Sequence, residues 1–133
     1  MEKITSSAYV KVAAAIIEKE GRILIGKRKM GRFAGMWEFP GSKIEPGETP
    51  QACLERELRE ELGVEARIGP FLLSTKHIYP HMPIELITYR AEILSGDLYL
   101  QEHTEIRWVA RQELADYDFP AADRAVIEKL MTA

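Results

Sequence analysis

The chain has 133 residues, of which 46% are hydrophobic and 29% are charged. This composition is that of a single globular domain and argues against a disordered chain or a membrane protein. The net charge of −3 lacks the basic excess with which proteins hold duplex nucleic acid by its phosphates. We therefore expect one domain over residues 1–133 that binds no nucleic acid stably and enters no membrane.

The N-terminal run, residues 1–17, alternates like a strand and is too short to span a bilayer. We expect no signal peptide and a cytoplasmic location. The single cysteine, Cys53, cannot form an internal disulfide, which agrees with a reducing compartment. We expect a small buried thiol at this position, not a nucleophile.

Two β-rich runs lie at residues 9–17 and 22–28. The short polar link between them ends in Gly21, and this pattern predicts a β-hairpin. Residues 29–48 are expected to form loops and irregular chain, with turns at Pro40-Gly41 and Pro46-Gly47.

A helix is predicted from about Thr49 to Leu62. Thr49 can cap this helix, Pro50 suits its first position and Gly63 suits its end. Leucines at steps of four give it an apolar stripe. The rest of the chain is predicted to form three strands and a closing helix, at residues 71–79, 84–94, 105–110 and 121–131.

Three glutamates gather near the end of the predicted helix. Glu57, Glu60 and Glu61 are spaced i, i+3 and i+4, so their carboxylates emerge from one face. Like charges at i, i+4 cost roughly 0.2 to 0.5 kcal/mol, and acids at this end also oppose the helix dipole. Bound divalent cations would remove both penalties. The alternative is a solvated face on which arginines four residues away pair with the acids.

The spacing from Ser42 onward is that of a known motif. Five residues separate Ser42 from Glu48, and seven more separate Glu48 from the run Arg56-Glu57-Leu58-Arg59-Glu60-Glu61-Leu62-Gly63-Val64. This pattern resembles the Nudix box, G-x5-E-x7-R-E-U-x-E-E-x-G-U with U aliphatic, at every fixed position except the first. The segments LIGKR, GMWEFPGSKIEPGE, EHTEIRWV and DFPAADRAVIEKL are similar to those of MutT-type nucleoside triphosphate pyrophosphohydrolases.

The resemblance implies a fold and an activity. The fold class is α/β, the Nudix fold, an α/β/α sandwich with a mixed β-sheet. The activity is Mg²⁺-dependent hydrolysis of a nucleoside or deoxynucleoside triphosphate, oxidised or cytosine-containing, to the monophosphate and pyrophosphate, with Mn²⁺ as a substitute. The alternatives are a Nudix hydrolase of ADP-ribose or a dinucleoside polyphosphate, and a non-catalytic nucleotide-binding module. A monomer or a homodimer is expected.

The resemblance also implies roles for the acidic residues. Arg56, Glu57 and Glu60 are expected to be catalytic, with Arg56 orienting a glutamate through a charge-assisted hydrogen bond. The expected metal ligands are the Gly41 carbonyl and the carboxylates of Glu57, Glu60, Glu61 and Glu102. The alternative for Glu102 is an ordinary surface glutamate.

The resemblance implies substrate contacts for five further residues. Arg28 and Lys43 match positions that contact phosphates, and Phe39 and Tyr79 border the base pocket unless they are ordinary core packing. Asp123 falls where the 8-oxoguanine-specific members carry an asparagine that reads the base. Because an ionised carboxylate only accepts hydrogen bonds, Asp123 would favour a base edge rich in N–H donors, such as that of cytosine or guanine. Its alternative role is to cap the last helix.

Other polar residues are expected to be structural. Glu48 is expected to brace the loop before the helix. His77 and His81 flank Tyr79-Pro80 and His103 is alone on its loop, so no histidine is assigned to zinc. If the loop needs a positive φ at Ser42, serine costs about 1 to 2 kcal/mol relative to glycine.

Overall fold

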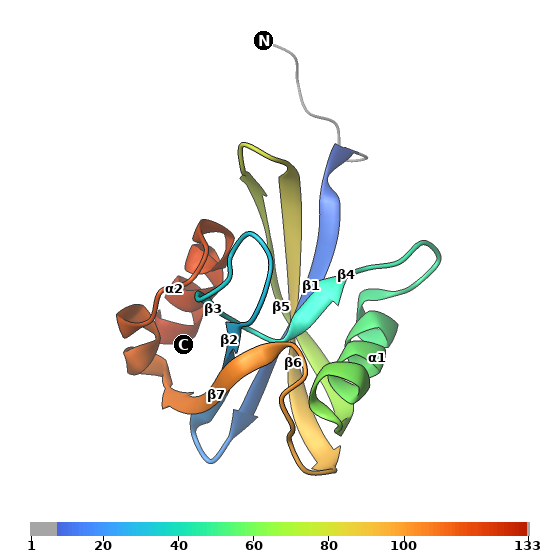
Figure 1. The fold of residues 1–133 in the computed structure, drawn as a ribbon, viewed down its shortest axis with the longest axis vertical. Helices are drawn as coiled ribbons and strands as arrows, with labels where there is room; N and C mark the ends of the chain where they lie inside the picture. The colour runs from blue at the N-terminus through green and yellow to red at the C-terminus, as the bar shows by residue number, and fades with distance from the viewer. Residues whose placement is uncertain (1–7, 133) are drawn as a thin grey trace.

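The apolar and β-branched runs of the chain form the strands of one mixed sheet (Figure 1). The computed structural model describes residues 8–132, so what is predicted for residues 1–7 and 133 lies outside it. The strands are β1 (Val10–Lys19), β2 (Arg22–Arg28), β3 (Trp37–Glu38), β4 (Gly41–Lys43), β5 (Glu65–Ile78), β6 (Pro83–Ser95) and β7 (His103–Ala110). The helices are α1 (Pro50–Leu62), α2 (Arg124–Thr132) and the 3-10 helices η2 (Arg111–Asp116) and η3 (Ala121–Asp123).

The order of the strands makes the sheet mixed. The order is β3-β2-β1-β6-β5, while β4 pairs with β1 and β7 pairs with β2. β1 and β6 run parallel, and the other pairs are antiparallel. α1 and α2 lie on opposite sides of the strands (Figure 1). The expected α/β/α sandwich with a mixed sheet is confirmed.

The predicted hairpin is formed by β1 and β2. Glu18 pairs with Ile23 in antiparallel register. Between the strands, Glu20 and Gly21 have φ angles of 53° and 77°. Two consecutive positive φ angles are what a type I′ hairpin turn requires, so the hairpin is confirmed with its turn chemistry.

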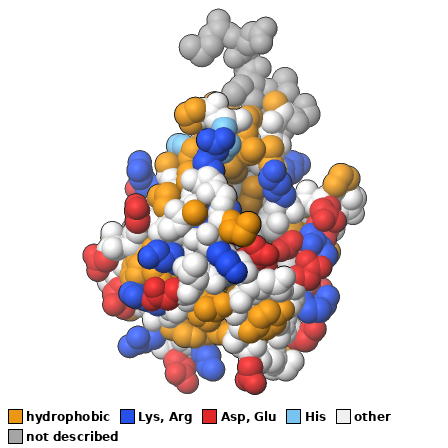
Figure 2. Space-filling view, in the orientation of Figure 1, with side chains coloured by type: hydrophobic (Ala, Val, Ile, Leu, Met, Phe, Trp, Pro, Cys, Tyr) orange, Lys and Arg blue, Asp and Glu red, His pale blue; other side chains and the backbone are white. Residues whose placement is uncertain are grey.

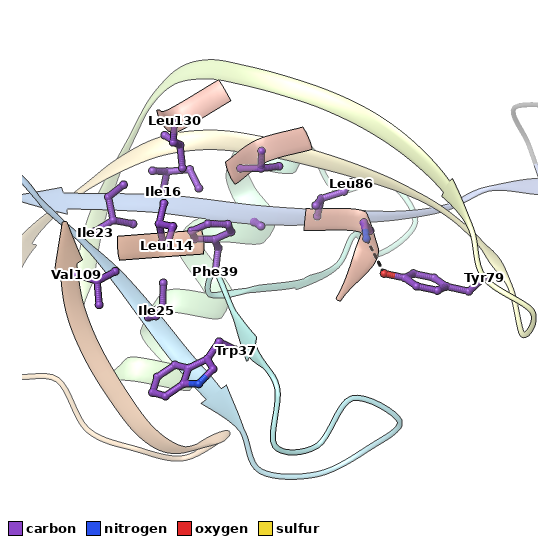
Figure 3. Packing of buried hydrophobic residues seen from close by; sticks show 13 residues of the cluster. Ile16, Ile23, Ile25, Trp37, Phe39, Tyr79, Leu86, Val109, Leu114 and Leu130 are labelled. Carbon is purple, nitrogen blue, oxygen red and sulfur yellow. Dashed lines mark hydrogen bonds between the residues drawn. The ribbon is translucent and has the colours of Figure 1, made fainter. Parts of the chain in front are cut away.

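The apolar side chains of β1 alternate between two cores, one on each face of the sheet. Ala14 and Ile16 belong to the core shared with α2 and the 3-10 helices (Figure 3). Ala13, Ala15 and Ile17 belong to the core shared with α1. A slip of one residue would reverse both faces, so this alternation sets the register of the sheet.

Helix α1 begins and ends where predicted. The Thr49 hydroxyl accepts a hydrogen bond from the Ala52 N–H at 3.1 Å, and Gly63 ends the helix in the left-handed conformation with φ 71°. The leucine stripe is fully buried: Leu54, Leu58 and Leu62. This packing holds the last turn of α1, which carries the glutamates, against the sheet.

Residues 37–43 do not form the irregular chain that was predicted. They contain β3, which pairs with β2, and β4, which pairs with β1. At Pro40-Gly41, where a turn was predicted, the chain bends at Pro40 and runs directly into β4, and the Ala15 N–H donates to the Pro40 carbonyl at 2.8 Å. Pairing with a distant strand leaves no mark on local composition. The turn at Pro46-Gly47 is confirmed, with φ 79° at Gly47.

Ser42 lies in extended chain and pairs with Ala13. Among the residues that the structure describes, Glu20 is the only non-glycine residue with a positive φ, so Ser42 carries no left-handed strain. Gly41 is the position that requires glycine, because a Cβ there would lie 1.9 Å from the Ala13 carbonyl oxygen. The motif's first glycine can therefore be serine in this chain.

Two further predictions are corrected. Strand β5 begins at Glu65, earlier than the predicted residue 71. Pro70 lies at a register shift between Ile68 and Phe71 in this edge strand, where a strand can contain proline. His103 is not alone on a loop: it begins β7 and is buried. Within residues 8–132 no helix is both long and apolar enough to cross a membrane.

Candidate active site

A cavity of about 560 Å³ opens beside α1. Its lining includes residues of β4, of the last turn of α1 and of the β5–β6 turn. It is lined by most of the residues predicted to hold metal or substrate: Arg28, Phe39, Gly41, Lys43, Glu61, Tyr79, Glu102 and Asp123. The other predicted site residues, Arg56, Glu57 and Glu60, do not line it. Glu61 lines the cavity from α1, and Glu57, whose negative charge adds to the raised pKa of Glu61, lies beside it.

Arg56 binds acidic side chains of α1 and of the loop before it. Its Nε and Nη2 donate to both carboxylate oxygens of Glu48 at 2.8 and 3.0 Å, and its Nη1 donates to Glu57 at 2.8 Å. The same nitrogen lies 3.4 Å from Glu60, so the expected i, i+4 pair is present as well. Acidic and basic side chains accordingly lie interleaved over α1 (Figure 2).

Glu48 braces the loop before α1, as predicted. Besides the two bonds from Arg56, its carboxylate accepts from the Glu45 N–H at 3.1 Å. The hydrogen bonds from Arg56 lower the pKa of Glu48 to about 2. A carboxylate bound in this way stays ionised and is already occupied by donors, which suits a structural role.

Glu61 is the acid that faces the cavity from α1. Its side chain is buried, and its Oε2 has no hydrogen-bond partner. Burial raises the pKa of Glu61 to about 9, and the negative charges of Glu38, Glu57 and Glu102 add to the shift. An unpartnered buried carboxylate among other acids fits a divalent cation, which would supply the missing partner and the missing charge.

The acids do not stand in a finished coordination geometry. Within residues 8–132 no group of three His, Cys, Asp or Glu side chains is arranged to hold a metal ion. Glu57 is bound to Arg56, and the side chain of Glu60 is 60% exposed. Ligation by the predicted set therefore requires side chains such as Glu57 to reorient.

Glu38 is a site residue that sequence reasoning missed. It lines the cavity from β3. Its Oε1 accepts from Arg28 Nη1 at 2.7 Å, and its Oε2 lies 2.8 Å from His103 Nε2. The sequence signal that could have indicated Glu38 is its position between two aromatic residues, Trp37 and Phe39, which are both buried. A charged side chain between two buried aromatic residues needs polar partners.

His103 supports Glu38 from β7. Its ring packs on Gly26 of β2, where a Cβ would lie 2.5 Å from the ring. Its Nδ1 is buried without a partner. Because the carboxylate of Glu38 only accepts when ionised, a neutral His103 carries its proton on Nε2 and donates to Glu38.

The two predicted phosphate-binding cations differ in freedom. Arg28 forms an ion pair with Glu38 and lines the cavity. Lys43 also lines the cavity, but its side chain is exposed. Arg28 therefore presents a charge that Glu38 holds in place, whereas the charge of Lys43 lies exposed to solvent.

The predicted base-pocket residues serve the core and the cavity at once. Phe39 belongs to the core and packs against Phe119, with the two rings tilted by 30° and their centroids 5.1 Å apart. The Tyr79 hydroxyl accepts from the Ala122 N–H at 2.8 Å (Figure 3). This bond ties the β5–β6 turn to η3, whose last residue is Asp123.

Asp123 faces the cavity from a buried position. Burial raises its pKa to about 7, the negative charge of Glu38 adds to the rise and Arg28 opposes it. Asp123 directly precedes α2, so contact with a base stays a prediction for it, as does its role as a cap.

Comparison with known proteins gives consistent matches over most of the chain. The family described as NUDIX domain matches residues 12–129. A CTP pyrophosphohydrolase of Escherichia coli is 37% identical over 123 residues, covering 92% of this chain and 91% of the relative. An 8-oxo-dGTP diphosphatase of Haemophilus influenzae is 36% identical over 124 residues, covering 92% and 91%.

Solved structures match the fold equally well. The solution structure of the Escherichia coli ORF135 protein has a TM-score of 0.83 at 35% identity and covers 98% of this chain and 94% of that one. The crystal structure of a MutT protein from Methanosarcina mazei has a TM-score of 0.83 at 26% identity, with 96% of each chain covered.

Proposed function

The chain belongs to the Nudix family of hydrolases, and from this premise we propose that it hydrolyses a nucleoside triphosphate to the monophosphate and pyrophosphate. The names of its relatives, a CTP pyrophosphohydrolase and 8-oxo-dGTP diphosphatases, support an oxidised or cytosine-containing nucleotide as the substrate. The single observation that carries the proposal is the buried, unpartnered carboxylate of Glu61 in a cavity that also holds Arg28 and Asp123.

We propose Mg²⁺ as the cation, with Mn²⁺ as a substitute. Carboxylate and carbonyl oxygens are the ligands that such hard cations prefer, and they would come from Gly41, Glu57, Glu60, Glu61 and Glu102. Bound there, a cation supplies neutralisation of the phosphate charge and activation of a water molecule.

The residues of the chain itself would hold the substrate in place. Arg28, fixed by Glu38, and Lys43 offer positive charge to the phosphates. Phe39 and Tyr79 supply apolar surface for the base, and Asp123 accepts hydrogen bonds from its edge. Arg56 orients Glu57 through a charge-assisted hydrogen bond, and Glu60, which Arg56 contacts less closely, would help to activate the water molecule.

We also propose that residues 1–133 form one domain that acts on free nucleotides in the cytoplasm as a monomer or a homodimer. The family match over residues 12–129 supports one domain. The buried Cys53, whose pKa burial raises to about 12, supports an inert thiol in a reducing compartment.

The test is pyrophosphate release with Mg²⁺ over dCTP, 5-substituted dCTP, dGTP, 8-oxo-dGTP, ADP-ribose and a dinucleoside polyphosphate. We expect a triphosphate to be the best substrate and Glu61→Gln to lower turnover by more than about 100-fold, since residues that only orient metal ligands already contribute about 10- to 100-fold. Glu55→Gln, an exposed change on the same helix, is the control. Near wild-type activity of Glu61→Gln contradicts the metal assignment, and preference for ADP-ribose contradicts the substrate class.

A further inference from the structure

Tyr99 is an aromatic residue that lies on the surface without joining either core. It is 47% exposed and belongs to the loop between β6 and β7. Its ring covers Gly63, where a Cβ would lie 2.1 Å from the ring Cε1. Its hydroxyl also lies 3.3 Å from Oε1 of the Gln101 side-chain amide. The oxygen and nitrogen of such an amide can exchange places, so the amide can also present its NH₂ group to the hydroxyl. This position places Tyr99 directly on the C-terminal end of α1.

Tyr99 satisfies backbone carbonyls that the end of α1 leaves open. The last four carbonyls of an α-helix have no partner inside the helix. The Tyr99 hydroxyl donates to the Glu60 carbonyl at 3.1 Å, and the Tyr99 N–H donates to the Leu62 carbonyl at 3.1 Å. The Arg59 carbonyl is taken by the Gly63 N–H at 3.0 Å. Tyr99 therefore completes the cap of the turn that carries Glu60 and Glu61.

The same loop carries Glu102 to the cavity. At its start, Gly96 has φ +100° and lies so close to Gly63 that a Cβ would be 2.6 Å from the Gly63 carbonyl oxygen. At its end, the Glu102 carbonyl accepts from the Lys29 N–H at 3.2 Å, and Glu102 lines the cavity. The loop of residues 96–102 is thus attached to α1 through Tyr99 and to the end of β2 through Glu102.

We infer that Tyr99 is a positioning residue: it holds the last turn of α1 and the loop with Glu102 at a fixed separation, so that Glu61 and Glu102 reach one cation together. Tyr99 touches neither the cavity nor the predicted ligands' carboxylates, and it acts only through the backbone. The inference rests on the proposed function, because the separation of these acids matters only if they hold a cation.

The test measures cation binding without turnover. Free Mn²⁺ is titrated by electron paramagnetic resonance against the wild-type chain, Tyr99→Ala, Tyr99→Phe and the control Leu100→Ala, which removes a side chain of similar exposure from the same loop. We expect Tyr99→Ala to weaken Mn²⁺ binding by about 10-fold, the lower end of the effect of residues that orient metal ligands. Tyr99→Phe keeps the ring and the N–H bond and should weaken binding by about 2- to 3-fold.

Kinetics and thermal melting separate positioning from a loss of folding. For Tyr99→Ala we expect kcat to fall with the Mn²⁺ affinity while KM for the nucleotide stays within about twofold, since the substrate contacts are untouched. Wild-type Mn²⁺ affinity in Tyr99→Ala, or an equal loss in Leu100→Ala, overturns the inference. If Tyr99→Ala does not fold, Tyr99→Phe decides, and unchanged Mn²⁺ binding in it overturns the inference. A wild-type chain that binds no Mn²⁺ and hydrolyses no nucleotide refutes the proposed function instead.

Discussion

At the scale of single residues, the cavity gathers carboxylates whose charges disfavour one another. Burial and the negative charge of Glu38 raise the pKa of Asp123 to about 7, and the positive charge of Arg28 opposes this rise. Near neutral pH its carboxyl is therefore divided between an ionised form that only accepts hydrogen bonds and a protonated form that also donates one. Asparagine, in contrast, offers an acceptor and two donors at every pH.

We therefore expect Asp123→Asn to change the ranking of substrates. The amide can donate to the carbonyl of an oxidised purine, so activity should move toward 8-oxo-dGTP and away from cytosine nucleotides, by roughly tenfold for a hydrogen bond gained or lost. The measurement is kcat/KM for dCTP and 8-oxo-dGTP. Asp118→Asn makes the same change at an exposed position of the same segment and serves as the control. An unchanged ranking would leave Asp123 with a structural role only.

At the scale of elements, the site depends on how closely β4 approaches β1. Gly41 and Ser42 pair with β1 in the middle of the sheet, and β4 leads into the loop that Glu48 and Arg56 brace. Of these two paired positions, Gly41 has no room for a side chain, because a Cβ there would lie 1.9 Å from the Ala13 carbonyl oxygen. The close approach, not a positive φ, is what requires glycine at position 41, the residue before the box.

Gly41→Ala and Ser42→Gly should therefore differ sharply. We expect Gly41→Ala to lower the free energy of unfolding by about 1 to 3 kcal/mol, the usual cost of forcing atoms into packed space, and to lower activity by displacing the Gly41 carbonyl. Ser42→Gly should cost about 0.5 to 1 kcal/mol, the entropy of glycine in a strand, with activity nearly unchanged. Urea denaturation and pyrophosphate release measure the two quantities. Equal effects of the two changes would show that the contact at Gly41 relaxes freely.

At the scale of the whole molecule, burying acids at the site costs stability. In the folded chain the pKa of Glu61 is raised to about 9, whereas its ordinary value is 4.5. Between these pH values the unfolded chain has lost a proton that the folded chain still binds, so the free energy of unfolding falls as pH rises. Asp123, whose pKa is raised from 3.8 to about 7, acts in the same direction. A bound divalent cation would offset this cost by pairing with the ionised form.

Without divalent cations, Glu61→Gln should therefore be more stable than the wild-type chain at pH 8, and the difference should vanish near pH 4. Each kcal/mol gained raises the Tm by roughly 4 °C in a domain of this size. Thermal melts with a chelator at pH 4, 6 and 8 measure the difference, and Glu55→Gln is the exposed control. Added Mg²⁺ should narrow the gap by stabilising only the wild-type chain. A Tm difference that does not grow with pH would contradict the raised pKa of Glu61.

The sequence by itself determined what depends on neighbours along the chain. The β1–β2 turn, the cap at Thr49, the end of α1 at Gly63 and its leucine stripe all follow from residues within a few positions of one another, and all were predicted. The spacing of the box also depends on local order alone, so the family and the acids of α1 could be read without coordinates.

Only the tertiary structure decided what depends on the path of the chain. Glu60 and Glu61 are adjacent on one helix, yet the side chain of Glu60 is 60% exposed and Glu61 is buried. Their burial differs because it is set by the elements that pack opposite each side chain. The pairing of Glu38 with His103, across 65 positions, and that of β4 with β1 arise in the same way. Hydrogen bonds between distant segments form only where the sheet brings their strands together, and no local pattern records that meeting.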